Sequence, residues 1–343
     1  MKRGFVMSKK TAAIIAGGAA AVLGACYGMG RFAFTQIIHR DSIVYTKVNE
    51  SIKRKEEARK AAERAAAGIP EPVVVPDERD VWFSKQVFEE FSLYNVEDRL
   101  NLKGYLLPAD EPSKVFVFCS HGYRNHGKGE FNYMAKFWHD MGYNVFLVDH
   151  RAAGLSEGKY VGFGYFEHSD SLKWLNFLIE RFGSDIQIIL HGVSMGSATV
   201  MMMSGDERLP ENVRFTVADC GYTSSWNEYK HNLDGWGVPA FPLLHCADLA
   251  CRIKAGYSFK DTDALARVKQ ARVPILFIHG GADNFVPTYM GKELYDACTS
   301  EKDLLIVEGA EHAMSYRTDS AEYEKRVKAF ADRFLEAVET VTV

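Results

Sequence analysis

One serine of the chain stands between two glycines, directly after an apolar run. Residues 188–200 read IILHGVSMGSATV, which places Ser194 between Gly192 and Gly196 in a G-x-S-x-G pattern. The two glycines fit a sharp turn from a strand into a helix, because a side chain at either position would collide with the neighbouring strand and helix. Such a turn holds a serine hydroxyl clear of its surroundings. The chemistry this arrangement indicates is nucleophilic attack by Ser194.

A serine hydroxyl attacks only when a base removes its proton, and the base must be oriented by an acid. His312, in VEGAEHAMS just after the last apolar run of the chain, is the best candidate for the base. Asp283, in HGGADNFVP just after the preceding apolar run, is the best candidate for the acid. Asp219 ends the apolar run that follows the serine and is the alternative acid.

Acyl transfer also needs hydrogen-bond donors for the oxyanion that develops on the substrate. The residue after the nucleophile normally supplies one backbone amide, which here is that of Met195. The second donor is expected in the loop after the apolar run KVFVFCSHG, most simply the amide of Tyr123.

The other histidines and cysteines do not indicate a metal site. The sequence contains neither H-E-x-x-H nor C-x-x-C, so no metal ion and no organic cofactor are predicted. Structural roles are expected for His121, for His191 and for Asp149, which lies in DHRAAGLSEG. Cys246 and Cys251 share one irregular segment, and they either form a disulfide or remain free thiols.

These candidates follow short apolar runs that alternate with amphipathic stretches of helical length. The runs are continuous rather than alternating, as is typical of strands buried on both faces. The alternation predicts an α/β fold with a mostly parallel sheet and helices on both faces, whose functional groups gather at the carboxyl ends of the strands. An antiparallel hairpin is expected ahead of it over residues 88–109. The predicted strands are residues 114–122, 143–151, 186–192, 214–221, 273–281 and 303–312, and the predicted helices are residues 130–142, 165–183, 194–205 and 288–299.

One long segment, residues 222–257, interrupts this alternation and is rich in aromatic residues and proline. We interpret it as a short lid over the site. Its aromatic side chains either line a substrate pocket or form the small core that holds the lid together. The candidate substrate-binding residues are Trp226, Trp236 and Phe241.

The N-terminus differs in composition from the rest of the chain. Four basic residues precede the uncharged residues 11–30, which are about as long as a membrane-spanning helix. Residues 1–35 are therefore predicted to be a transmembrane signal anchor, with a cleaved signal peptide or a lipoprotein signal ending at Cys26 as the alternatives. The charge distribution favours a catalytic domain outside the cytoplasm.

Residues 36–80 are predicted to be a charged helical spacer and a proline-rich linker, and residues 81–343 the catalytic domain. The 343 residues include 47% hydrophobic and 25% charged residues, with a net charge of −4. This composition is typical of a globular protein and argues against nucleic-acid binding, which calls for a basic face. The oligomeric state is left open.

From about Val81 to the C-terminus the chain resembles the α/β-hydrolase superfamily, in which the triad residues also follow the order Ser, Asp, His. The segments HGYRNHG, DHRAAGLSEG, GADNFVP and AEHA are similar to those of its serine aminopeptidase-like and membrane-anchored bacterial esterase-like branches. The resemblance implies an eight-stranded sheet, a lid and hydrolysis through an acyl-enzyme. Two departures are Ala152 and Ala313, which stand where glycine is common.

The sequence thus predicts a membrane-anchored serine hydrolase that cleaves a small-molecule carboxylic ester. One alternative is a serine aminopeptidase acting on short peptides, which would need an acidic group near the site to bind the substrate amine. Another is a membrane-tethered binding protein that has lost turnover.

Overall fold

The computed structural model describes residues 9–42, 54–55, 58–59, 61–67 and 77–336, and the side chains from residue 24 onward. Its centre is an eight-stranded sheet in the order β1-β2-β4-β3-β5-β6-β7-β8. The first two strands form the predicted hairpin, and β2 also pairs antiparallel with β4, whereas the remaining neighbours are parallel. The strands are β1 Glu89–Asn95, β2 Leu100–Leu107, β3 Val115–Ser120, β4 Asn144–Asp149, β5 Gln187–Val193, β6 Val213–Asp219, β7 Ile275–Gly280 and β8 Lys302–Val307.

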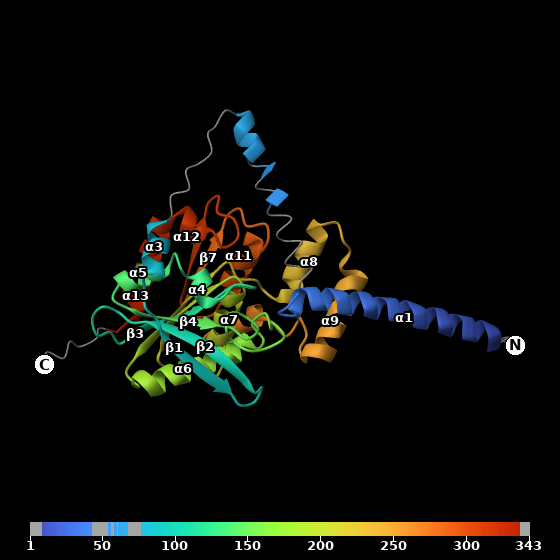
Figure 1. Cartoon of the computed structure of the whole chain (residues 1–343), viewed down its shortest axis with the longest axis horizontal. Helices are drawn as coiled ribbons and strands as arrows, with labels where there is room; N and C mark the ends of the chain where they lie inside the picture. The colour runs from blue at the N-terminus through green and yellow to red at the C-terminus, as the bar shows by residue number, and fades with distance from the viewer. Residues whose placement is uncertain (1–8, 43–53, 56–57, 60, 68–76, 337–343) are drawn as a thin grey trace.

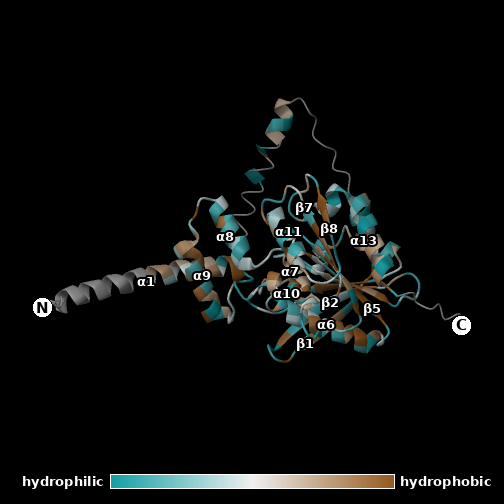
Figure 2. Ribbon diagram, turned by 180° about the vertical axis from the view of Figure 1, so that it is seen from behind, coloured by the Kyte–Doolittle hydropathy of each residue, from teal (hydrophilic) through white to brown (hydrophobic). Residues whose placement is uncertain are grey.

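The six parallel strands lie where the apolar runs predict them. Every residue of β3, β4, β5 and β7 is buried, which explains why these runs are continuous rather than alternating. Figure 2 shows that the strands are mostly hydrophobic, while the helices that cover them carry both kinds of residue. The α/β fold class and the eight-stranded, mostly parallel sheet are therefore confirmed.

Helices cover both faces of the sheet, and alternate strand residues pack against different helices. Val117 and Cys119 face the core formed with α3, α5 and α13, whereas Phe116 and Phe118 face the core formed with α6 and α7. Helix α3 begins inside the predicted linker, and α13 lies outside the predicted helices. The bounds are α3 Glu78–Ser84, α4 Gly127–Glu130, α5 Ala135–Asp140, α6 Glu167–Phe182, α7 Met195–Ser204, α10 Ala264–Val268, α11 Thr288–Ala297, α12 Ser315–Thr318 and α13 Ser320–Phe334.

The predicted lid is built of two helices, α8 (Ser225–Gly235) and α9 (Ala240–Ala255). A third helix, α1 (Lys9–Ile38), lies across α9 although the two are more than 200 residues apart in sequence (Figure 1). A Cβ atom at Gly30 would overlap the carbonyl oxygen of Cys246, so the two helices touch backbone to backbone there. The aromatic segment thus forms a helical lid that packs against the N-terminal helix.

The end of α1 is tied to the catalytic domain by hydrogen bonds. The Tyr123 hydroxyl donates to the carbonyl oxygen of Ile37, and Arg124 donates to the carbonyl oxygens of Gln36 and His39. The backbone N–H of Val161 donates to the carbonyl oxygen of Ile38. These contacts join residues 36–39, assigned to the predicted spacer, to the fold of the catalytic domain.

The predicted membrane anchor finds no support in the described residues. Among them, no helix is both long and apolar enough to cross a bilayer. The side chains of residues 11–23, the larger part of the predicted span, lie outside the description. Beyond them, Phe34 and Ile38 of α1 are buried in the core shared with the lid and the sheet, so these apolar side chains pack against protein. The extracytoplasmic location stays a prediction.

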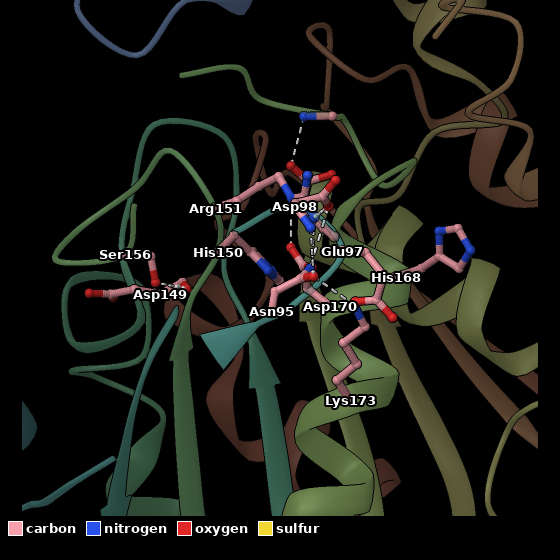
Figure 3. A network of polar contacts seen from close by, with 12 residues as sticks. Asn95, Glu97, Asp98, Asp149, His150, Arg151, Ser156, His168, Asp170 and Lys173 are labelled. Atoms are coloured by element: carbon pink, nitrogen blue, oxygen red, sulfur yellow. Dashed lines mark hydrogen bonds and ion pairs between the residues drawn. The ribbon is translucent and has the colours of Figure 1, made fainter. Parts of the chain in front are cut away.

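A buried ionic network fixes the loop after β4 to the β1–β2 hairpin and to α6 (Figure 3). The guanidinium of Arg151 donates to both carboxylate oxygens of Asp170, at 2.6 and 2.7 Å, and to Asp98 at 2.7 Å. Asn95 also donates to Asp170, and Lys173 donates to Asn95. Breaking one partner of such a buried pair typically costs about 3–5 kcal/mol, so the network holds this loop firmly beside the site.

Candidate active site

Ser194 stands at the junction of β5 and α7, in a backbone conformation that few residues adopt. Its φ and ψ are 57° and −115°, and it is the N-terminal capping residue of α7. A Cβ atom at Gly192 would overlap the carbonyl oxygen of Gly196, and one at Gly196 would overlap that of Ser120. Both glycines are thus required by lack of space, as their pattern predicts. The strained turn directs the serine side chain away from the strand.

The three predicted reacting side chains lie in one hydrogen-bonded chain. The Nε2 atom of His312 is 2.9 Å from the Oγ atom of Ser194, and its Nδ1 atom is 2.7 Å from the Oδ2 atom of Asp283. With Nδ1–H donating to the carboxylate, Nε2 is left as the acceptor for the serine proton. This is the tautomer that a general base requires.

Asp283 is held as a carboxylate by its surroundings. Its Oδ1 atom accepts hydrogen bonds from the backbone N–H groups of Phe285 and Val286, at 3.0 and 2.9 Å. Burial acts to raise the pKa of Asp283, but interactions with His279 and His312 outweigh it and lower the pKa to about 2. A group that stays ionised at neutral pH can orient the imidazole and stabilise its protonated form.

The alternative acid, Asp219, makes no hydrogen bond to His312 among the described contacts. Its Oδ1 atom accepts from the Ser315 hydroxyl at 3.2 Å, and its carbonyl oxygen accepts from the Ser194 N–H at 2.9 Å. Burial raises the pKa of Asp219 to about 6. Asp219 therefore stabilises the turn at Ser194 and does not orient the base, His312.

The loop after β3 runs beside the nucleophile, where the second oxyanion donor is expected. A Cβ atom at Gly122 would lie 3.4 Å from the Cβ atom of Ser194, and the next residue, Tyr123, lines the same cavity as Ser194 and Met195. The Met195 N–H lies in the first turn of α7, where N–H groups have no acceptor within the helix. The two predicted amides thus belong to segments on either side of Ser194.

A cavity of about 350 Å³ opens beside Ser194 and lies mainly under the lid. Its walls come from α1, α8 and α9 together with loops at the carboxyl edge of the sheet. Apolar and aromatic side chains predominate, among them Ile37 of α1, Leu233 of α8, Leu244 of α9 and Phe163. Such a cavity suits an apolar part of a small molecule placed next to the reacting serine.

The three lid residues predicted to bind substrate have different positions. Trp236 lines the cavity, although 72% of its surface is exposed. Trp226 and Phe241 are not among the lining residues. Each contacts the ring of His245 edge-on, and Lys260 lies over the ring of Trp226. Trp226 packs against the core shared with the lid, whereas 72% of the surface of Phe241 is exposed.

Sequence reasoning missed several residues of the cavity wall. Ile37 lies in the predicted spacer, and Glu228 lies in the predicted lid, where only aromatic residues are candidates for substrate binding. Phe285 follows Asp283 at the mouth of the cavity, with its ring 5.0 Å from that of His312. A signal for Phe285 existed, since it belongs to HGGADNFVP, the segment that carries the acid. No comparable signal marks Ile37 or Glu228.

The residues predicted to be structural are engaged in the core. His191 accepts a hydrogen bond from Trp138 and donates one to Tyr323, and burial lowers its pKa to about 3. His121 bonds to the backbone at both ring nitrogens, and burial lowers its pKa to about 4. The Asp149 carboxylate accepts from the N–H groups of Gly127 and Leu155, so it orders two loops. The predicted roles of all three are confirmed.

The two alanines that depart from the family pattern adopt the conformation that favours glycine. Ala152 has φ 58° and Ala313 has φ 57°. Both positions therefore keep the left-handed backbone that glycine adopts most readily.

Among the described residues, one group could offer three metal ligands, namely Cys220, Asp283 and His312. Two of these already bond within the serine, histidine and aspartate chain, so the group gives no independent reason for a metal.

All six cysteines are free. Cys246 and Cys251 lie on α9 rather than in an irregular segment, and a spacing of five residues places them on different sides of that helix.

Comparison with known proteins agrees with this architecture. The family model described as serine aminopeptidase, S33, matches residues 111–221 and 245–319. The chain belongs to this family of α/β hydrolases. YqkD of Bacillus subtilis (strain 168) is 32% identical over 241 residues, which cover 70% of this chain and 78% of that protein.

Solved structures with the same fold include an esterase and a peptidase. The esterase Pf2001 of Pyrococcus furiosus has a TM-score of 0.60 at 21% identity, covering 77% of this chain and 97% of that one. An acylaminoacyl peptidase of Pyrococcus horikoshii has a TM-score of 0.55 at 20% identity, covering 77% of this chain and 45% of that one. These likenesses concern the fold, which hosts both ester and peptide hydrolysis.

Proposed function

We propose that the protein is a serine hydrolase that cleaves carboxylic esters through an acyl-enzyme. The observation that carries the proposal is the chain from Ser194 through His312 to Asp283, placed at an apolar cavity. His312 removes the proton of Ser194 as its Oγ atom attacks the ester carbonyl, and Asp283 holds the imidazole in the required tautomer. The backbone N–H groups of Tyr123 and Met195 stabilise the oxyanion.

The second half of the reaction uses the same groups. His312 gives its proton to the departing alcohol, and a water molecule then attacks the acyl-enzyme with His312 again as the base. The apolar cavity holds the acyl chain and lowers the amount of water around the ester. Neither half needs a metal ion or an organic cofactor.

The shape and lining of the cavity support esters with an apolar acyl group over short peptides. Action on a peptide N-terminus would call for a charged carboxylate near the site to bind the amine. Glu228 lines the cavity, but burial raises its pKa to about 8, so its carboxyl group is largely uncharged at neutral pH. The peptidase remains the second candidate because of this carboxyl group.

Hydrolysis of p-nitrophenyl esters of increasing acyl length by the full chain tests the proposal. We expect the rate to pass through a maximum at one chain length, and Ser194→Ala to lower kcat by about 10⁶-fold, as for other serine triads. A rate in the Ser194→Ala protein close to that of the unaltered protein would exclude this mechanism. Absence of ester hydrolysis with turnover of aminoacyl amides would favour the peptidase, and absence of both would favour a binding protein.

A further inference from the structure

Gly122, in the loop after β3, is held by hydrogen bonds on the peptide groups before and after it. Its N–H donates to the Oε2 atom of Glu130 at 3.0 Å. Its carbonyl oxygen lies 2.7 Å from the Nδ1 atom of His121 and accepts the N–H of Asn125 at 3.3 Å. A glycine turns easily about its φ and ψ bonds, so these hydrogen bonds fix a backbone that would otherwise have many conformations.

The carbonyl oxygen of Gly122 and the N–H of Tyr123 belong to one planar, trans peptide group. In such a group the oxygen and the N–H point in opposite directions, so whatever holds the oxygen also sets the direction of the N–H. A Cβ atom at Gly122 would lie 3.4 Å from the Cβ atom of Ser194, so this peptide group lies beside the nucleophile. The conformation of Gly122 therefore decides whether the Tyr123 N–H can donate to an oxyanion.

Glu130 is the last residue of α4, a short helix that is fixed to the sheet. A Cβ atom at Gly127, where α4 begins, would lie 2.7 Å from the carbonyl oxygen of Val148 in β4. The Gly127 N–H donates to the carboxylate of Asp149 at 2.9 Å, and Phe131, directly after α4, is fully buried. The Glu130 side chain is thus attached to a rigid part of the fold and brings a fixed acceptor to the loop.

The Glu130 carboxylate holds this loop at two points. Its Oε2 atom also accepts from the side-chain amide of Asn125 at 3.0 Å, so one oxygen joins the start and the end of the turn over residues 122–125. Burial raises the pKa of Glu130, while the hydrogen bonds from Gly122 and Asn125 and the charge of His312 act to lower it. The carboxyl group is therefore engaged with the loop and within electrostatic reach of the base.

We propose that Glu130 is a positioning residue that directs the Tyr123 N–H toward the oxyanion. This inference rests on the ester hydrolysis proposed at Ser194. Glu130 touches neither the substrate nor the reacting atoms, and it acts by holding Gly122. A group misplaced by about 1 Å can lower a rate about 100-fold, and removal of one oxyanion donor lowers kcat by about 10²–10³-fold. Because the oxyanion exists only in the transition state, loss of the Glu130 carboxylate should lower kcat rather than raise KM.

The test measures kcat and KM of the full chain for a p-nitrophenyl ester, with kcat given per reactive serine as counted by complete fluorophosphonate labelling. We expect Glu130→Ala to lower kcat by about 10- to 100-fold with little change in KM. Glu130→Gln should retain most of the rate, because its amide oxygen can accept both hydrogen bonds in place of Oε2. Glu180→Gln, which changes an exposed residue of α6, is the matched control and should leave kcat and KM unchanged.

A trifluoromethyl ketone provides a second readout, because the adduct it forms with the serine carries an oxyanion as the transition state does. Its binding should weaken in the Glu130→Ala protein by a factor similar to the loss in kcat, and should change little in the Glu130→Gln protein. A purely structural role of Glu130 would not move this affinity and kcat together.

The outcomes separate this inference from the proposed function. A kcat of the Glu130→Ala protein close to that of the unaltered protein would overturn the positioning role and leave ester hydrolysis standing. An equal loss of kcat in Glu130→Gln and Glu130→Ala would overturn it in favour of a carboxylate that acts on His312 through its charge. A loss confined to the number of reactive serines or to the melting temperature would overturn it in favour of a role in folding alone. Absence of Ser194-dependent ester hydrolysis in the unaltered protein would overturn both proposals.

Discussion

At the scale of single residues, two buried carboxyl groups near Ser194 have opposite properties. The pKa of Asp283 is lowered to about 2 and that of Asp219 is raised to about 6. The difference follows from their hydrogen-bond partners. Asp283 accepts hydrogen bonds from the imidazole of His312 and from two backbone N–H groups, whereas Asp219 accepts one from the hydroxyl of Ser315. Environments that separate two carboxyl groups in this way assign them different roles.

Replacement of each aspartate by asparagine distinguishes these roles. Asp283→Asn should lower kcat for a p-nitrophenyl ester by about 10⁴-fold, because the amide favours the wrong tautomer of His312. Asp219→Asn should change kcat by less than about tenfold, because Asp219 contacts neither His312 nor the Ser194 hydroxyl in the described contacts. A larger loss of kcat in the Asp219→Asn protein than in the Asp283→Asn protein would show that Asp219, not Asp283, orients His312.

Glu228 makes the stability of the protein depend on pH. Its folded pKa of about 8 lies above the ordinary pKa of a glutamate, 4.5, so between these pH values the folded state holds a proton that the unfolded state has released. The free energy of unfolding should therefore fall as pH rises from about 4.5 to about 8. Glu228→Gln should remove this dependence and add a few kcal/mol of stability at pH 8.

Urea unfolding at pH 5 and at pH 8 measures this effect. The gap in unfolding free energy between the Glu228→Gln protein and the unaltered protein should be small at pH 5 and wide at pH 8. An equal gap at both pH values would show that Glu228 is ionised in the folded protein throughout this range.

At the scale of helices, the backbones of the N-terminal helix and the lid approach each other closely at one glycine of their interface. Gly30 is buried against the backbone of Cys246, whereas Gly28, two residues earlier, is exposed and has nothing within 4 Å of an added Cβ atom. Gly30→Ala should separate α1 from α9 and cost about 1–3 kcal/mol through overpacking. Gly28→Ala should be neutral or slightly stabilising, because alanine favours the helix.

Limited proteolysis and thermal unfolding of these two variants measure the packing of α1. We expect faster cleavage near α1 and a lower melting temperature in the Gly30→Ala protein only. Equal behaviour of both variants would show that α1 does not pack on α9 in solution.

The last turn of α1 should also affect the choice of acyl chain. Ile37 lines the cavity, so Ile37→Ala should shift the preferred p-nitrophenyl ester toward longer chains, and Ile37→Phe should shift it toward shorter ones. The acyl-length profile of each variant provides the measurement, beside that of Leu249→Ala, which changes an exposed residue of α9 outside the cavity. Identical profiles in all of these proteins would exclude α1 from the substrate pocket.

At the scale of the whole molecule, the sequence could predict those parts of the structure that depend on short stretches of neighbouring residues. Buried parallel strands leave continuous apolar runs, and the turn at Ser194 leaves two glycines, so the sheet and the positions of the three reacting side chains could be read directly. The order of residues along the chain then placed Asp283 and His312 at the same edge of the sheet. Local sequence patterns were therefore enough to predict most of the strands of the catalytic domain.

The parts that could not be predicted depend on packing between distant segments. An apolar helix face looks the same in sequence whether it faces lipid or another helix, so the role of Phe34 and Ile38 in the protein core stayed hidden. Glu228 lies among polar residues of α8, and nothing in that segment shows that the fold buries it. Both cases involve α1 or the lid, whose packing joins segments far apart in the sequence.

Intact-mass and peptide analysis of the full chain after reaction with a fluorophosphonate tests directly whether Ser194 is the nucleophile. Ser194 should displace fluoride from phosphorus, and we expect one adduct per chain, located on Ser194 and absent from the Ser194→Ala protein. An unmodified Ser194 in a folded protein that still hydrolyses esters would exclude Ser194 as the nucleophile, because the reaction would then proceed without it.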